Sequence, residues 1–318
     1  MKYRILGDSD LKVSAVGLGT WAYGNDTFGA VDDQQAVNAL RTAVESGINL
    51  IDTAPAYGDG RSEIVVGKAV EGIRDKVVMA TKCGVYRDGE DYVRDLSPSR
   101  IRKDIELSLS RLNIEQIDLY QIHWPDPDTP LEKTVEELIK LKKEGKFKYL
   151  GVSNSNRDLL AHITNMTDVI SLQPQYSLLE RKLENEILPF IIEKGMGILS
   201  YGTLGGGILS GKYTEIPDFD DEKDNRSEFY PFFKEDNWPY VQELIDLIKE
   251  IAADYDKTPA QISINWSISR PGITTALVGA KTEKQAQENA LAADFHLADS
   301  EMELLTKKSN KIISQIDK

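Results

Sequence analysis

Residues 51–67 read IDTAPAYGDGRSEIVVG and place two reactive side chains at the end of a predicted strand. The apolar run 48–51 ends at a carboxylate, Asp52, and the glycine- and proline-rich loop that follows carries Tyr57. A helical pattern then opens at 61–63. A strand, an acid, a turn-rich loop and a helix in this order are typical of a βα unit that presents polar groups at the carboxyl end of its strand.

The same alternation recurs in both directions from this unit. Short apolar runs predict strands at 15–19, 48–51, 76–81, 117–122, 149–153, 169–173, 196–201 and 273–278. Helical patterns are predicted at 36–44, 62–71, 98–111, 131–144, 156–164, 181–194, 237–269 (as a pair) and 282–292. Eight βα units in 318 residues predict an α/β fold, a (β/α)8 TIM barrel that forms one domain over 1–318. A doubly wound sheet is the alternative.

Three segments lie outside the repeated units. An N-terminal β-hairpin is predicted within 2–15, and an extra C-terminal helix within 299–316. The segment 202–236, after the seventh strand, is too long for an ordinary βα connection. Since long loops in compact domains usually have a function, this loop is expected to serve the site.

Two glycine motifs resemble nucleotide-binding sequences without fitting them. Residues 17–22 match G-x-G-x-x-A after a strand, but the chain continues as a loop, whereas a Rossmann unit needs a helix there. Residues 206–212 approach a P-loop, but Tyr213 replaces the hydroxyl residue that holds Mg²⁺. Neither motif therefore predicts its usual fold.

Composition limits the classes of partner and compartment. The net charge of −14 disfavours nucleic acid, because an acidic surface repels phosphate. A single cysteine, Cys83, fits a reducing compartment. The start of the sequence has no apolar signal region, and no run approaches the length of a membrane span, so we expect a cytoplasmic protein without a membrane partner.

Neighbouring strand ends supply more reactive groups. The predicted third strand is followed by Lys82 and the fourth by His123. In a barrel, residues at the carboxyl ends of strands face the active site, so these two side chains are expected to meet Asp52 and Tyr57.

The chemistry of this set points to proton transfer to a carbonyl oxygen. Lys82 is expected to lower the pKa of Tyr57, Asp52 to orient Lys82, and His123 to donate a hydrogen bond to the carbonyl. No metal site is predicted, because the three histidines lack ligand spacing. Since no side chain delivers hydride, a cofactor must do so.

These residues, with others along the chain, resemble the aldo-keto reductase superfamily. Matching pieces are Gly-Leu-Gly-Thr-Trp at 17–21, Gly-Ile-Asn-Leu-Ile-Asp-Thr-Ala at 47–54, Ile-Asp-Leu-Tyr-Gln-Ile-His at 117–123 and Gly-Val-Ser-Asn at 151–154. The chain looks most similar to bacterial oxidoreductases related to inositol-catabolism and general-stress members. The resemblance implies NADPH-dependent reduction of aldehydes or ketones, with Asp52, Tyr57, Lys82 and His123 as the catalytic tetrad.

The resemblance also implies a set of cofactor contacts. They are Thr20, Trp21, Asp52, Ser153, Asn154, Gln173, Tyr201, Gly202, Thr203, Leu204, Gly206, Gly207, Lys212, Arg226, Gly279, Lys281, Gln285, Glu288 and Asn289. Many relatives have an arginine in place of Gln285, which commonly contacts the 2′-phosphate of NADPH. Lys281 is the remaining nearby cation, so NADPH/NADP⁺ is the expected cofactor and NADH the alternative.

The substrate is expected to be a small carbonyl compound: an aldehyde, a ketone or a sugar. Trp21, Tyr57, Tyr86, His123 and Trp124 are the candidate pocket residues, since aromatic walls are usual for small-molecule sites. Two other functions stay open from the sequence: a cofactor-binding regulatory subunit with little turnover, and a phosphate-binding barrel isomerase. The expected assembly is a monomer or small homo-oligomer.

Overall fold

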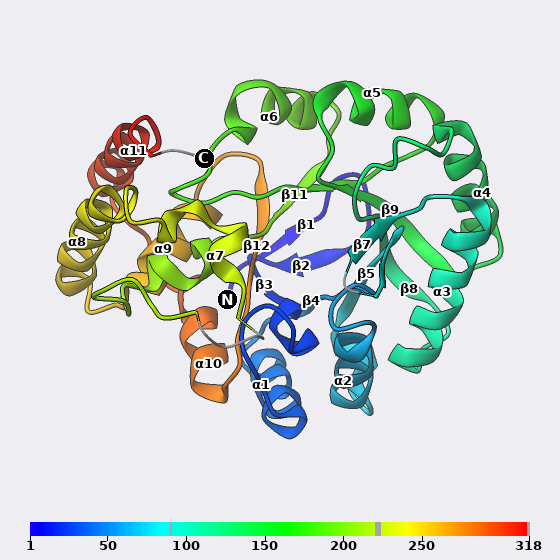
Figure 1. The fold of residues 1–318 in the computed structure, drawn as a ribbon, viewed down its shortest axis with the longest axis horizontal. Helices are drawn as coiled ribbons and strands as arrows, with labels where there is room; N and C mark the ends of the chain where they lie inside the picture. Colours follow the sequence, from blue (N-terminus) through cyan, green and yellow to red (C-terminus); the bar gives the residue numbers. More distant parts are fainter. Residues whose placement is uncertain (90, 220–223, 317–318) are drawn as a thin grey trace.

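A closed barrel of eight parallel strands forms the centre of the computed structural model, which describes residues 1–89, 91–219 and 224–316 (Figure 1). The strands are β3 (Val16–Gly19), β4 (Leu50–Asp52), β5 (Val78–Cys83), β8 (Ile117–Ile122), β9 (Phe147–Ser153), β10 (Ser171–Gln173), β11 (Gly197–Ser200) and β12 (Ile273–Val278). Each pairs with the next, and β12 pairs with β3 to close the ring. The predicted (β/α)8 fold is confirmed, and closure excludes a doubly wound sheet, which is open.

Helices surround the barrel on its outside (Figure 1). They are α1 (Asp33–Glu45), α2 (Arg61–Val70), α3 (Pro98–Leu112), α4 (Leu131–Lys143), α5 (Arg157–Met166), α6 (Leu183–Glu193), α8 (Trp238–Asp254), α9 (Pro259–Ile268) and α10 (Glu283–Leu291). The predicted pair over 237–269 corresponds to α8 and α9. Thr258 starts α9 with a capping box: its hydroxyl accepts from the backbone N–H of Gln261, and the Gln261 side chain accepts from the N–H of Thr258.

The N-terminal hairpin covers the amino ends of the barrel strands. It consists of β1 (Tyr3–Ile5) and β2 (Lys12–Ser14), which pair antiparallel. Its apolar residues Leu6, Leu11 and Val13 are buried in one cluster with Leu50 and Leu119 from the barrel. The opposite, carboxyl end of the barrel is therefore the end that can receive a ligand.

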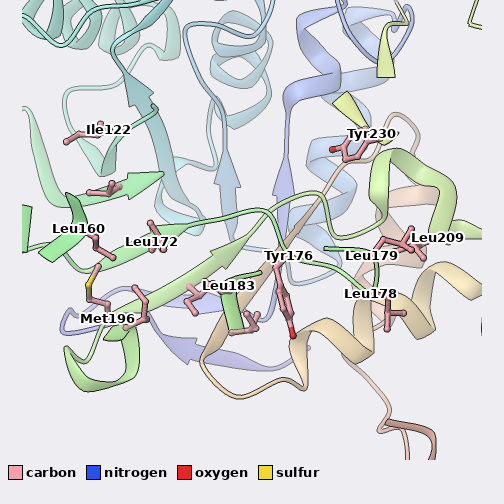
Figure 2. Packing of buried hydrophobic residues seen from close by; sticks show 14 of the residues in the cluster. Ile122, Leu160, Leu172, Tyr176, Leu178, Leu179, Leu183, Met196, Leu209 and Tyr230 are labelled. Atoms are coloured by element: carbon pink, nitrogen blue, oxygen red, sulfur yellow. The ribbon is translucent and has the colours of Figure 1, made fainter. Parts of the chain in front are cut away.

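Apolar side chains fill the space between the barrel and its helices (Figure 2). In β10, Leu172 is fully buried in this outer cluster, while the side chain of its neighbour Gln173 bonds to Asp52 inside the barrel. Burying one leucine contributes about 1.5–3 kcal/mol. Tyr176 stacks on Trp266 of α9 with ring centroids 5.6 Å apart. Strand alternation thus divides residues between a packing face and a functional face.

Two segments differ from a plain repeat of βα units. A hairpin that the sequence patterns did not predict, β6 (Val85–Asp88) with β7 (Asp91–Arg94), follows β5. The long connection after β11 contains η3 (Gly205–Ser210), α7 (Arg226–Phe229) and η4 (Pro231–Phe233), and residues 220–223 of the predicted loop lie outside the described residues. The predicted extra helix is α11 (Asp299–Ile313).

The local structure also agrees with the rejection of both nucleotide-binding motifs. After β3 the chain forms a 3-10 turn, η1 (Trp21–Gly24), and no helix begins until α1 at Asp33. After Lys212, the next helix among the described residues is α7, at Arg226.

Candidate active site

The carboxyl ends of β4, β5 and β8 bring the four predicted catalytic residues together. Asp52 is the last residue of β4, Lys82 is the penultimate residue of β5, and His123 directly follows β8. In the parallel register, Asp52 lies opposite Ala80 and Lys82 opposite Gln121, so the three strand ends are nearly level.

The Lys82 ammonium links Asp52 to Tyr57. Its Nζ donates to Asp52 Oδ2 at 2.6 Å, to the Thr53 carbonyl at 2.8 Å and to the Tyr57 hydroxyl at 3.1 Å. The Lys82 side chain is fully buried, and burial is the largest influence on its pKa, which it lowers, while Asp52 opposes that shift. All three ammonium protons therefore have acceptors, and one acceptor is the phenol.

Asp52 is held from its other side by two amides. Gln121 Nε2 and Gln173 Nε2 donate to Asp52 Oδ1 at 3.0 Å and 2.7 Å. Gln121 was not singled out in the sequence, although a glutamine inside the apolar strand 117–122 is an unusual feature that points to an interior partner. The two amides and Lys82 together fix the orientation of the carboxylate.

Tyr57 is fixed by its loop and by neighbouring rings. The next residue, Gly58, donates its N–H to Asp26 Oδ2 at 3.0 Å. The Tyr57 ring stacks on Trp21 with centroids 5.8 Å apart, and meets His123 edge-on at 5.9 Å. The phenol and the imidazole therefore face a common space.

The protonation of both rings follows from burial. Burial raises the pKa of Tyr57 well above its ordinary value, and the charges of Asp52 and Asp26 add to the increase. This differs from the expectation that Lys82 lowers the phenol pKa, because desolvation of the buried phenol outweighs the effect of the ammonium. Burial, with Lys82 and Arg94, holds the pKa of His123 well below its usual range. Both groups are thus neutral at neutral pH.

A cavity of about 820 Å³ opens over these residues at the carboxyl ends of the strands. Every predicted cofactor residue lines it: Thr20, Trp21, Asp52, Ser153, Asn154, Gln173, Tyr201, Gly202, Thr203, Leu204, Gly206, Gly207, Lys212, Arg226, Gly279, Lys281, Gln285, Glu288 and Asn289. Tyr57, His123 and Trp124 line it as well, whereas Lys82 lies behind the wall.

The structure does not bring Tyr86 to this cavity. Tyr86 lies on the other face of β6, where the Arg100 guanidinium sits 3.7 Å from its ring centroid. Its neighbour Val85 lines the cavity instead, with Tyr92 and Arg94 from β7. Phe28, Gln175, Phe229 and Tyr230 are further lining residues that the sequence did not indicate. All belong to loops, to the short helix α7 or to the unpredicted hairpin, whose side-chain directions depend on tertiary contacts.

The polar groups of one end of the cavity form a connected set. Tyr201 OH donates to Asn154 Oδ1 at 2.8 Å, and Asn154 Nδ2 donates to Ser153 Oγ at 3.0 Å. The same Nδ2 donates to the His123 carbonyl at 3.0 Å. This set lies beside Tyr57 and His123, with an aromatic ring and amide groups suited to a flat polar ligand such as a nicotinamide.

Cations line the other end of the cavity. Arg226 donates to Asp224 and to the Gly206 carbonyl, and so ties α7 to the glycine-rich turn η3. Lys281 Nζ donates to the backbone carbonyls of Phe28 and Gly29. Lys212 also lines this end, so the cavity can take an elongated ligand with phosphates.

The described part of the chain contains neither a cluster of metal ligands nor a helix that could span a membrane. Within residues 1–89, 91–219 and 224–316, no group of three or more His, Cys, Asp or Glu side chains has the arrangement of a metal site. Over the same residues, no helix has the length and apolar character that crossing a membrane requires.

Comparisons with known proteins agree with this geometry. A model of the aldo/keto reductase family matches residues 15–310. The aldo-keto reductase YhdN of Bacillus subtilis is 37% identical over 292 residues, which cover 90% of this chain and 87% of that protein. The NADH-specific methylglyoxal reductase of Escherichia coli is 32% identical over 328 residues, covering 98% and 99%.

Solved structures give the same result. A glycerol dehydrogenase from Gluconobacter oxydans superposes with a TM-score of 0.90 at 34% identity, covering 99% of this chain and 97% of that one. An aldo/keto reductase from Klebsiella pneumoniae in complex with NADP and acetate gives a TM-score of 0.75 at 28% identity, covering 95% and 93%.

Proposed function

The chain belongs to the aldo/keto reductase family, and we propose that it is an NADP(H)-dependent reductase of aldehydes and ketones with Tyr57 as proton donor. At the coarser level it is an NAD(P)H-dependent oxidoreductase that reduces carbonyl groups. One observation carries the finer proposal: Lys82 Nζ donates to both Asp52 Oδ2 and Tyr57 OH, at 2.6 Å and 3.1 Å, beside His123.

The side chains of this site divide the proton chemistry between them. A bound nicotinamide supplies the hydride that forms the new C–H bond at the carbonyl carbon. Tyr57 is neutral and donates its proton to the carbonyl oxygen, and the Lys82 ammonium stabilises the phenolate that is left. His123, also neutral, donates to the same oxygen and positions it. Asp52 acts indirectly, by orienting Lys82.

The donor set of the cavity fits a nicotinamide dinucleotide. The amides of Asn154 and Gln173 lie at the Tyr57 end, and Lys212, Arg226 and Lys281 at the other. The solved relative that holds NADP supports NADPH as the preferred cofactor. The relative named as NADH-specific, and Gln285 in place of the usual arginine, support NADH as the weaker alternative.

Other parts of the proposal rest on sequence and composition. The substrates are proposed to be small aldehydes, ketones or sugars, in line with relatives named for methylglyoxal and glycerol. The resemblance noted in the sequence supports a place among bacterial oxidoreductases related to inositol-catabolism and general-stress members. Residues 1–318 are proposed to form one domain, and the single cysteine supports a cytoplasmic location.

Substituting the proton donor tests the mechanism. Tyr57→Phe should lower the rate of NADPH oxidation with aldehydes by about 10²–10⁴-fold, because the ring stays and only the proton is lost. NADPH binding, followed by nicotinamide fluorescence, should be nearly unchanged. Tyr149→Phe is the matched control, since Tyr149 donates to Asp10 at the opposite end of the barrel. Parental turnover by Tyr57→Phe would reject Tyr57 as the donor.

A further inference from the structure

An arginine lines the cavity at the end where the carbonyl is reduced. Arg94 is the last residue of β7, and its guanidinium lies over the Trp124 ring, 4.7 Å from the centroid. Trp124 directly follows His123, and the charge of Arg94 contributes to the lowered pKa of that histidine. Arg94 is therefore a close neighbour of the catalytic residues.

The Arg94 guanidinium has no counter-ion in the described part of the chain. Within those residues, no Asp or Glu oxygen lies within 4.0 Å of it, and its side chain makes no hydrogen bond. The other cationic groups nearby are engaged: Arg87, on the same hairpin, approaches Asp26 Oδ2 at 3.9 Å, and Arg226 pairs with Asp224 at 2.5 Å. Arg94 is exposed to solvent, but it lines the cavity and has no acidic partner among the described residues, in a chain with a net charge of −14.

We propose that the site is built for carbonyl substrates that carry a carboxylate or phosphate group, which Arg94 binds while Tyr57 and His123 hold the carbonyl oxygen. This inference rests on the proposed reductase function and adds a substrate class to it. The atoms between the two groups of the substrate lie along the Trp124 ring. The planar guanidinium fork matches the oxygens of either anion and binds them with two parallel hydrogen bonds.

Position explains why this arginine selects among substrates rather than binding the cofactor. Arg94 lies on the β6–β7 hairpin beside Trp124, whereas the cations Lys212, Arg226 and Lys281 come from the loops after β11 and β12. Arg94 is an exposed residue, so water screens part of its charge and limits the strength of the charge-assisted hydrogen bond. A preference of about tenfold for an anionic substrate over a neutral analogue is the expected size.

Paired substrates test the proposal. For the parent protein, kcat/KM should be about tenfold higher for 4-oxobutanoate than for its methyl ester, since only the former has the anion. The same comparison of glyceraldehyde 3-phosphate with glyceraldehyde distinguishes a phosphate from a carboxylate ligand. Arg94→Gln should bring the preferred ratio close to one, mainly through KM, and Arg94→Lys should keep part of it. High salt should reduce the ratio in the parent protein.

Arg87→Gln is the matched control, because it removes the same charge from the same hairpin outside the cavity. It should leave the ratio at the parental value. Ratios near one in the parent for both substrate pairs would overturn the proposal, as would an unchanged ratio in Arg94→Gln. In those cases neutral aldehydes would still be reduced, whereas failure of the proposed reductase function would appear as no turnover of any aldehyde, neutral or anionic.

Discussion

At the scale of single residues, the proposed role of Tyr57 as proton donor depends on a series of contacts that runs from its hydroxyl through Lys82 to Asp52. Lys82 touches the phenol, Asp52 touches Lys82, and Gln121 and Gln173 touch Asp52. The phenol is protonated before reaction because burial raises its pKa, and the adjacent ammonium favours the phenolate only as the proton leaves. The same arrangement thus supplies an acid and stabilises its conjugate base.

The pH dependence of reduction follows from these neutral groups. Reduction needs protonated Tyr57, a state present below a pKa that is raised, and neutral His123, a state present above a pKa that is lowered. Both shifts widen the active range, so kcat/KM should be flat from about pH 6 to pH 9. The measurement is a pH profile with saturating NADPH and a neutral aldehyde. An acid limb near pH 6.5, the ordinary histidine value, would contradict the neutral imidazole.

The sequence could predict that the four proposed catalytic residues lie close together, because each stands at or just after the carboxyl end of a predicted strand. It could not predict that Gln121 shares Asp52 with Gln173, since this depends on the register between strands. The choice between Tyr86 and Val85 as cavity residues depends likewise on the face that a hairpin turns inward.

At the scale of elements, the barrel strands were predictable and the β6–β7 hairpin was not. Buried parallel strands are continuous apolar runs, whereas β6 and β7 are short, charged and partly exposed. Their position depends on a contact from a distant loop: Tyr92 of β7 donates to Asp26 Oδ2 at 3.3 Å. Asp26 also accepts from Gly58, so one carboxylate links the hairpin to the loop that carries Tyr57.

The β4–α2 loop gives a prediction at this scale. Gly58 has a φ of +61°, and a Cβ there would lie 2.0 Å from the Gly24 carbonyl oxygen. Gly58→Ala should therefore lower the free energy of unfolding by about 1–3 kcal/mol and displace Tyr57, which reduces turnover as well. Thermal unfolding and NADPH oxidation measure the two effects.

Gly72→Ala is the control for backbone strain alone. Gly72 also has a positive φ, +78°, but a Cβ there would meet nothing within 4 Å. Its cost should be only about 1–2 kcal/mol, with parental turnover. If Gly58→Ala keeps full turnover, the close approach of this loop to Gly24 does not position Tyr57.

At the scale of the whole molecule, the eight βα units and a functional role for the loop 202–236 were readable in the sequence, but the contacts that close over the cavity were not. Phe28 and Asp224 form an isolated β-bridge, and Lys281 donates to the carbonyls of Phe28 and Gly29. Phe28 and Phe229 both pack edge-on against Trp21, with centroids 5.1 Å and 5.3 Å away. These segments meet only after the barrel closes, because they follow β3, β11 and β12, and no local pattern encodes such contacts.

The proposed cofactor cavity is lined by segments that follow β3, β11 and β12. Because these segments are distant in the sequence, cofactor binding should raise the free energy of unfolding of the entire fold. NADPH at 100 times its Kd adds about 2.7 kcal/mol to the free energy of unfolding, or roughly 5 °C in Tm for a chain of this size. NADH at the same concentration should give a smaller shift, by about 1.4 kcal/mol if it binds tenfold more weakly.

Lys281→Met should remove the advantage of NADPH and leave the NADH shift nearly unchanged. This result would separate recognition of the 2′-phosphate from loss of the bonds that Lys281 makes to the carbonyls of Phe28 and Gly29. Thermal unfolding with each cofactor measures these shifts. Equal shifts in the parent protein would contradict the preference for NADPH, and no shift with either would contradict nicotinamide binding itself.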